Sequence, residues 1–247
     1  LQRTQELLRD LFHIEVSQGT LVNWTRELHH KVAPAEVEIV QQLKQSDTVH
    51  ADETGMFCEN TLHWVHVVGT SSLTHLQMHH KRGSEAIDAI GIIGSLRGRA
   101  IHDFWSPYFK YDIEHGICNA HLIRELTAAY ENDMQPWALE MKKLLLRIHE
   151  RVEQAKAQNK RSLPAHTRQY YKRRYRALLT IAKTLNPRQE SPPGKRGKPK
   201  QTKTRNLTDR MSDHHDAVLV FMEDFRVPFT NNQAERDLFH QKPYPLN

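Results

Sequence analysis

Two aspartates stand at the ends of short β-favouring runs, each directly before a break. Asp52 ends a run from Thr48 that stops at Thr54-Gly55, and Asp103 ends a run from Arg99. A carboxylate at the carboxyl end of a strand projects into the crevice where open α/β sheets bind ligands. Two such acids from adjacent strands repel each other unless a cation neutralises them, and Mg²⁺ suits this role because it prefers oxygen ligands. The spacing suggests a magnesium site, with coincidence among 29 acids as the alternative.

The elements that would position these acids follow a mixed order. Residue patterning predicts strands at residues 48–52, 62–68, 73–78, 99–103 and 113–118. Helices are predicted at residues 84–93 and 120–130, the second with Asn119 as its cap. The tight links between the first three strands predict an antiparallel meander. The whole order predicts a mixed α/β sheet covered by helices.

The first 45 residues are predicted to be helical. Two helices are expected on either side of the short link at residues 13–16, with Ser17 as the cap of the second. Leu21, Trp24, Leu28 and Val32 would share one face of that second helix, and a further helix is expected to begin at Pro34. Such a pair resembles a helix-turn-helix, which reads DNA, but any packed helical hairpin has the same pattern.

The chain beyond residue 130 has helical patterning. A long helix is predicted from Pro136, with a core face formed by Trp137, Met141, Leu144, Ile148 and Val152. A second is marked by Tyr171, Tyr175, Leu178 and Leu185, and a third is predicted over residues 207–225. Residues 186–206 have no large apolar side chain and predict a flexible basic segment. Asn231 or Asn232 is expected to cap a last short helix.

Basic residues are concentrated in one stretch of the chain. Residues 141–206 contain 20 Lys or Arg and three acids, a charge of +17, whereas the remainder carries −11. Such asymmetry indicates a polyanionic partner, and we expect nucleic acid because the release of condensed counterions drives its binding. A solvated helical face followed by a charged linker is the alternative interpretation.

Composition excludes several classes of protein. The longest unbroken apolar run has six residues, 217–222, whereas a membrane-spanning helix needs about 20. The first twenty residues lack the apolar region of a secretory signal. Cys58 and Cys118 are too few for a disulfide scaffold. We therefore expect a folded cytoplasmic protein that is associated with the nucleoid if it binds DNA.

Six local strings occur in an order that carries more information than periodicity does. They are His50-Ala51-Asp52-Glu53-Thr54-Gly55, His63-Trp64, Lys81-Arg82-Gly83, His102-Asp103 with Pro107-Tyr108, Cys118-Asn119-Ala120-His121-Leu122-Ile123-Arg124-Glu125-Leu126, and Asn231-Asn232-Gln233-Ala234-Glu235-Arg236. Together they resemble the transposases of the bacterial insertion sequence 66 family, over residues 1–238. None of the strings would be specific alone, but the ordered set is.

The resemblance implies a ribonuclease-H-like α/β fold of the DDE type. It implies a helical, helix-turn-helix-like segment at 1–45, the first part of the catalytic core at 46–130, a basic helical insertion at 131–206 with its linker at 186–206, and C-terminal helices that complete the core at 207–247. The insertion would explain why Asp103 and Glu235 lie 132 positions apart, far more than a compact core needs.

The resemblance also implies the chemistry. Asp52, Asp103 and Glu235 would be the catalytic carboxylates and would hold two Mg²⁺ ions, for which Mn²⁺ can substitute. Water would first free a 3′-OH at the transposon end, and that hydroxyl would then attack target DNA. The implied partners are transposon-end and target DNA and a second copy of the chain, with no membrane and no small-molecule substrate.

Contacts to DNA are expected from basic side chains outside the acidic trio. The candidates are Arg82, Arg124, Lys172, Arg173, Arg174, Lys195, Arg196, Lys198 and Lys200. Arg124 is also a candidate partner for a carboxylate.

Several residues near the trio have competing interpretations. His50 shares the face of Asp52 if the strand alternates, and Glu53 would then point to the opposite face, which favours a structural role. Cys118 and His121 have the start of a zinc-ligand spacing, but a local structural role is the alternative. Adjacent histidine pairs at 29–30, 79–80 and 214–215 are not expected to bind one ion, because neighbouring side chains in a strand or helix point apart.

One departure from the family pattern leaves rival functions open. After Leu238 the chain continues as Phe239 to Asn247 in place of the family's basic segment, and Pro243 and Pro245 cannot extend a helix. The last helix is therefore expected to be short and poorly anchored, as in a truncated or decayed copy. The rivals to a transposase are a catalytically dead DNA-binding remnant and a ribonuclease-H-like nuclease without strand transfer.

Overall fold

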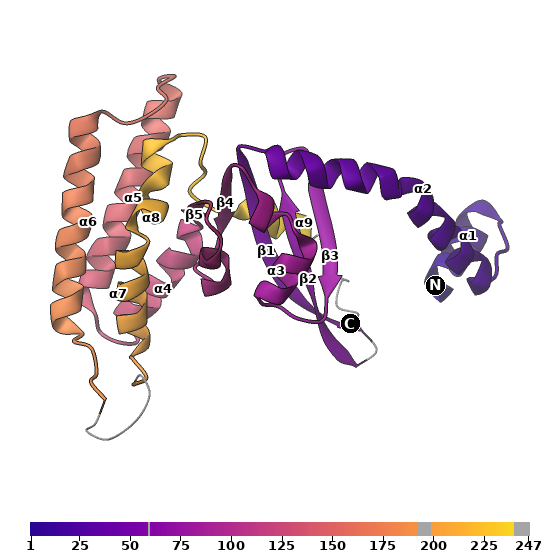
Figure 1. Cartoon of the computed structure of the whole chain (residues 1–247), viewed down its shortest axis with the longest axis horizontal. Helices are drawn as coiled ribbons and strands as arrows, with labels where there is room; N and C mark the ends of the chain where they lie inside the picture. Colours follow the sequence, from indigo (N-terminus) through magenta and orange to yellow (C-terminus); the bar gives the residue numbers. More distant parts are fainter. Residues whose placement is uncertain (59, 192–198, 240–247) are drawn as a thin grey trace.

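The computed structural model describes residues 1–58, 60–191 and 199–239, and Figure 1 shows its elements. The N-terminal and sheet regions contain α1 (Gln2–Phe12), α2 (Gln18–Gln45), β1 (Thr48–Cys58), β2 (Thr61–Gly69), β3 (Thr74–His79), α3 (Ser84–Ile90), the 3-10 turn η1 (Ile93–Ser95), β4 (Arg99–His102), η2 (Ser106–Lys110) and β5 (Glu114–Ile117). The remainder is helical, with α4 (Asn119–Glu131), α5 (Pro136–Ala157), α6 (Ala165–Leu185), α7 (Lys203–Asp213), α8 (His215–Glu223) and α9 (Asn232–Phe239).

One mixed sheet of five strands carries the fold, in the order β3-β2-β1-β4-β5. β1 pairs with β2 and β2 with β3 in antiparallel register, which confirms the predicted meander. β4 runs parallel to β1, and β5 runs parallel to β4. This is a ribonuclease-H-like α/β fold, as the sequence resemblance implied.

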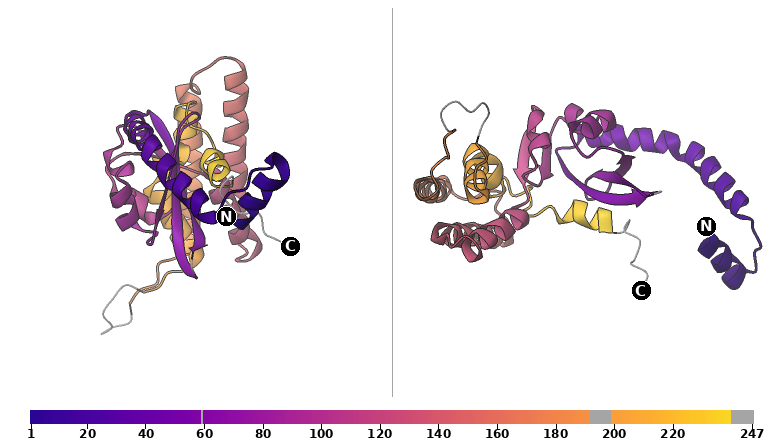
Figure 2. Two further views of the ribbon diagram at one scale, coloured as in Figure 1. Left: turned by 90° about the vertical axis from the view of Figure 1, so that its right-hand side faces the viewer. Right: turned by 90° about the horizontal axis from the view of Figure 1, so that it is seen from below.

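Alternation along the strands gives the sheet two different faces. Val49, Ala51 and Val68 belong to a buried cluster with Ile87 of α3 and with Leu43 of α2. Val65 and Val67 belong to a separate cluster with α9, which lies on the other side of the sheet (Figure 2). Residues with odd numbers on β1 therefore face α3, and those with even numbers share the face that α9 covers.

β1 is six residues longer than the sequence predicted. A break was expected at Thr54-Gly55, but β1 continues to Cys58 because β2 pairs with it along its whole length. Gly55 lies opposite Trp64, and a Cβ at Gly55 would come within 3.2 Å of the Leu62 side chain. The glycine here makes room for neighbouring side chains and does not mark a turn.

Helices α4 to α8 form a bundle, and its core also includes Ile101 of β4 and Ile117 of β5. The predicted core face of α5, including Trp137, Met141 and Ile148, is fully buried, and Tyr175 of α6 joins it. The single helix predicted over 207–225 is instead two, α7 and α8, which meet at His214. Both pack in the bundle, and α8 also borders β5. Of the described helices after residue 206, only α9 lies on the sheet beside β1 and β2.

The C-terminal part of α2 packs on the sheet through Leu43, whereas the start of α2 and α1 extend beyond the sheet, on the side away from the bundle (Figure 1). Ser17 caps α2 as predicted, because its side chain accepts a hydrogen bond from the Thr20 N–H. The helix predicted to begin at Pro34 does not exist separately, because α2 continues through this residue. Leu21 is buried, but Trp24 and Leu28 on the same face are 51% and 60% exposed. No helix among the described residues is both long and apolar enough to cross a bilayer.

Candidate active site

The two aspartates meet where β4 ends beside β1. The parallel register pairs His50 with Ile101, and two residues further along each strand it brings Asp52 level with Asp103. Asp52 therefore lies inside β1 and not at its end, but it lies just beyond the residues that pair with β4. Asp103 follows the last residue of β4, and its carboxylate accepts a hydrogen bond of 2.9 Å from the Trp105 N–H.

Glu235 reaches the same face from α9, 183 residues after Asp52. Ala234 and Leu238 are buried against Val65 and Val67 of β2. The Thr74 hydroxyl of β3 donates a hydrogen bond of 2.9 Å to Asp237. The helix has only eight residues, but these contacts fix it, so the expectation of a poorly anchored last helix was wrong.

Asn231 joins α9 to the two segments that carry the site. Its side-chain amide donates to the Ala51 carbonyl oxygen at 2.9 Å, and its Oδ1 lies 2.8 Å from His50 Nδ1. Its backbone N–H donates to Cys118 Sγ at 3.1 Å. Asn231 is buried and directly precedes α9, which is the cap position that the sequence predicted, and its side chain binds β1. The adjacent asparagines Asn231 and Asn232 indicated the start of a helix in the sequence. They did not indicate that Asn231 binds a residue 180 positions away.

Burial and like charge both perturb Asp52. The pKa of Asp52 is raised to about 6: burial is the largest cause, and the negative charges of Asp103 and Glu235 act in the same direction. The Glu53 N–H, which donates to Asp52 Oδ1 at 2.9 Å, and the charge of His121 act in the opposite direction. Three carboxylates from distant segments thus interact in one site, where Asp103 and Glu235 both disfavour the ionised form of Asp52.

The carboxylate oxygens of this site are suitable ligands for hard divalent cations. Carboxylate oxygens are the ligands that Mg²⁺ and Mn²⁺ prefer, and a bound cation would remove the repulsion that raises the pKa of Asp52. Asp52, Asp103 and Glu235 are the residues that could hold such ions.

Cys118, His121 and Arg124 surround the third acid. Glu235 Oε1 lies 3.9 Å from His121 Nδ1 and 3.7 Å from an Arg124 guanidinium nitrogen. His121 Nδ1 lies 3.3 Å from Cys118 Sγ, and this contact is the largest cause that raises the pKa of His121. One potential ligand atom each from Cys118, His121 and Glu235 lie within 4.8 Å of one another. Arg124 is therefore placed as a carboxylate partner, one of its two predicted roles.

Cys118 directly precedes α4 and so occupies the cap position that the sequence analysis assigned to Asn119. Asn119 is the first residue of the helix, and it is buried with its side-chain amide donating to the Val218 carbonyl oxygen at 3.2 Å. Asn119 therefore ties α4 to α8 and does not cap its own helix.

The opposite face of β1 carries a second buried carboxylate. Glu53 points away from Asp52, as predicted, and accepts hydrogen bonds from Arg82 at 2.6 Å and from the Tyr108 hydroxyl at 2.9 Å. Arg82 lies over the rings of Trp64 and Trp105, at 4.9 and 4.3 Å from their centres. Burial raises the pKa of Glu53 to about 7 against the opposing effect of Arg82. Arg82, predicted to contact DNA, thus links β1 to the segment after Asp103, and its side chain is 38% exposed.

The basic residues predicted on the bundle have different surroundings. Lys172 pairs with Glu223 at 2.8 Å. Arg173, Arg174 and Lys200 are exposed. Lys195, Arg196 and Lys198 lie outside the described residues.

Comparison with known proteins places the chain in a family. No curated protein sequence matches it. A chain in the cryo-EM structure of a simian T-cell lymphotropic virus intasome in complex with PP2A regulatory subunit B56 gamma is similar over 38% of this chain and 47% of that one, with 16% identity and a TM-score of 0.23. The match thus spans about half the length of that chain. The family model described as Transposase IS66 family matches residues 1–242, nearly the whole sequence. The chain therefore belongs to the insertion sequence 66 family of DDE transposases.

Proposed function

We propose that this protein cuts DNA at the ends of a transposon and joins the freed ends to target DNA, with Asp52, Asp103 and Glu235 as its catalytic carboxylates. The observation that carries the proposal is the convergence of three acids from β1, the end of β4 and α9 on one face of the sheet. A folded protein gains no stability from burying mutually repelling carboxylates, so their grouping favours a role in chemistry.

The residues around the trio orient its oxygens. The Glu53 N–H holds Asp52 Oδ1, and the Trp105 N–H holds Asp103 Oδ1. Asn231 sets the distance between α9 and β1, and thereby the position from which Glu235 extends. When divalent ions are bound to these carboxylates, they would activate the attacking oxygen and stabilise the leaving oxygen. No side-chain nucleophile is required in this scheme.

DNA binding is proposed to depend on side chains that lie apart from the carboxylates. Arg173 and Arg174 are exposed on α6, and Lys200 is exposed just before α7. Cations on the surface can neutralise backbone phosphates without reading bases, and such binding weakens steeply as salt concentration rises.

Cleavage of transposon-end DNA in Mg²⁺ or Mn²⁺ tests the proposal. The wild-type protein should nick the end and form joined products with a second duplex, whereas Asp52→Asn should do neither and should retain its DNA affinity. Asp112→Asn is the matched control, because Asp112 is exposed on the same domain. A footprint without nicks would identify a DNA-binding remnant. Nicks without joined products would identify a nuclease, and either result would overturn the proposal.

A further inference from the structure

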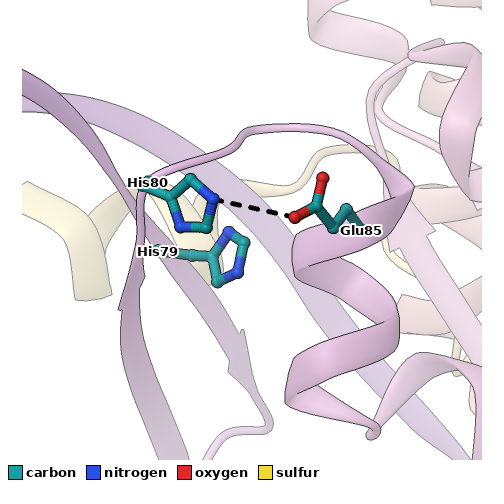
Figure 3. Close-up of side chains that lie close together, drawn as sticks. All are labelled: His79, His80 and Glu85. Carbon is teal, nitrogen blue, oxygen red and sulfur yellow. Dashed lines mark ion pairs between the residues drawn. The ribbon is translucent and has the colours of Figure 1, made fainter.

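A second group of potential metal ligands lies at the far end of β3, on residues that the proposed chemistry does not use. His79 is the last residue of β3, His80 follows it, and Glu85 is in the first turn of α3. One ligand atom from each lies within 4.8 Å of the others. Figure 3 shows the two imidazole rings beside the carboxylate, with His80 Nε2 3.6 Å from Glu85 Oε1.

The convergence arises because the strand ends inside the histidine pair. Neighbouring side chains of a continuing strand point to opposite faces, which is why the sequence predicted that this pair would not bind one ion. Beyond His79 the backbone leaves the strand, and the two ring centres come within 4.3 Å of each other at an angle of 30°. The premise of that expectation, that both histidines belong to one continuing strand, therefore does not hold for His79 and His80.

The backbone beyond the strand also engages one nitrogen of His79. Nδ1 of His79 lies 3.0 Å from the Lys81 backbone nitrogen and 3.3 Å from its carbonyl oxygen. When Nδ1 carries the ring proton, it donates to the Lys81 carbonyl oxygen and Nε2 has a free lone pair for a metal ion. In the other neutral tautomer Nδ1 accepts from the Lys81 N–H and Nε2 is protonated, so metal binding selects the first tautomer. Contacts of this kind fix the orientation of the imidazole in known metal sites.

The chemistry of the three donors selects one class of ion. Two imidazoles and one carboxylate suit Zn²⁺ and similar transition ions, whereas Mg²⁺ prefers oxygen alone. Bonds of about 2.0 to 2.2 Å in a tetrahedral site place ligand atoms roughly 3.3 to 3.6 Å apart, close to the His80–Glu85 separation of 3.6 Å. We propose that His79, His80 and Glu85 bind one Zn²⁺ ion, with a fourth position open to water.

Such an ion would act on the loop that carries Arg82. It would join the end of β3 to the start of α3 and so restrain residues 81–83 between them. Arg82 in turn binds Glu53, whose N–H holds Asp52. The zinc site would thus be a structural clamp beside the carboxylate site and chemically distinct from it. Its existence does not depend on the proposed DNA cleavage.

Zinc titration of the full chain tests the site directly. Protein stripped with EDTA and returned to buffer with excess Mg²⁺ should bind one equivalent of Zn²⁺ by calorimetry, and Co²⁺ should give the visible absorption of a low-coordinate ion. His80→Ala and Glu85→Gln should each weaken Zn²⁺ binding by more than about tenfold. Because both side chains are more than half exposed, neither variant should disturb the fold, which circular dichroism can verify.

Two control variants locate the ion. His30→Ala removes one member of another adjacent pair, whose ring centres are 5.8 Å apart, and should leave Zn²⁺ affinity unchanged. His121→Ala removes a member of the Cys118–His121–Glu235 group and should leave it unchanged as well. Absence of saturable Zn²⁺ binding would overturn the proposal. So would affinity that survives both His80→Ala and Glu85→Gln, or affinity that is lost only in His121→Ala.

Stability gives a second readout that distinguishes a clamp from adventitious binding. Zn²⁺ should raise the Tm of the wild-type protein and of His30→Ala, but not that of Glu85→Gln, because an ion that binds only the folded state stabilises it. It should also slow amide exchange at residues 81–83 in the wild type. Zinc binding without either effect would contradict the role assigned to the ion.

Discussion

Acids in the helical bundle and acids on the sheet have opposite electrostatic surroundings. In the bundle, burial acts to raise the pKa of Asp209, but Arg205 and Arg188 bring it below its usual value. Arg168 and Lys172 do the same for Glu223. On the sheet, the pKa of Asp52 rises to about 6, because burial and two neighbouring acids outweigh the groups that favour its charge. The bundle acids stabilise the fold, whereas the sheet acids are retained at an electrostatic cost.

The basic side chains of residues 141–206 also fall into two groups with different surroundings. Part of its charge is directed inward, where Arg205, with a side chain only 10% exposed, binds Asp209 at 3.0 Å. Part remains on the surface, as at Arg173 and Arg174. A count of charges in the sequence cannot separate these two groups, because the acids that pair with the first group lie outside the basic stretch or in other helices.

The largest expected effect is on activity at the sheet site. Asp52→Asn should reduce DNA cleavage by at least about 1,000-fold, while the free energy of unfolding stays the same or rises, because the variant removes a repelled charge. Single-turnover cleavage and urea unfolding measure the two quantities. A variant that lost both activity and stability would show that Asp52 supports the fold, and the contrast with the bundle would fail.

Asn231→Ala should have the next largest effect. It removes the side-chain bonds to Ala51 and His50 and leaves buried polar groups without partners, so the free energy of unfolding should fall by about 2 to 4 kcal/mol. Cleavage should fall as well, because α9 carries Glu235. Asn232→Ala is the control, since Asn232 is exposed. Equal stability of the two variants would show that α9 is held by its apolar contacts alone.

Asp209→Asn should destabilise the bundle by about 1 to 2 kcal/mol. It weakens the bonds from Arg205 and Arg188 while keeping the volume of the side chain. Urea unfolding measures the change, and DNA cleavage should stay at the wild-type level in conditions where the variant is folded. A neutral result would mean that this ion pair contributes no more than an exposed one.

The smallest effect concerns the pH dependence of stability in the absence of divalent ions. The pKa of Asp52 is about 6 in the folded protein and near 3.8 when unfolded, so between these values the folded state binds the proton more tightly. The contribution of Asp52 to the free energy of unfolding is therefore largest below about pH 4 and is lost as the pH rises toward 6. Asp52→Asn should lack this loss. The measurement is the free energy of unfolding of both proteins in EDTA at several pH values. The difference between the variant and the wild type should grow from pH 4 to 6. A constant difference would contradict a raised pKa for Asp52.

Local signals predicted the sheet better than they predicted the links between distant segments. Short runs of β-favouring residues, bounded by turn residues, identified the five strands of the described sheet. The end of β1 was missed because its partner β2 keeps it extended past Gly55. The continuity of α2 through Pro34 was missed because a proline signals only the lost N–H and not the strength of the helix around it.

The sequence allowed the candidate carboxylates to be named, but not the contacts that hold them in place. Asp52, Asp103 and Glu235 could be named from short strings. In the structure, Asp103 and Glu235 lie close enough to Asp52 for their charges to raise its pKa. The bonds of Asn231 to β1, the pairing of Arg82 with Glu53, and the approach of Arg124 to Glu235 each depend on how separate segments meet. Nothing within a few residues of these positions encodes those contacts.

The long separation between the strands and α9 has a consequence for biosynthesis. The last residue of β5 is Ile117, and Glu235 follows 118 residues later. At translation rates of about 5 to 20 residues per second, roughly 6 to 24 s pass before the ribosome supplies the third carboxylate. During that interval a nascent chain can form the sheet but cannot complete the acidic trio, and Val65 and Val67 have no α9 to cover them. The candidate site would therefore be completed late in synthesis, after the whole bundle has been made.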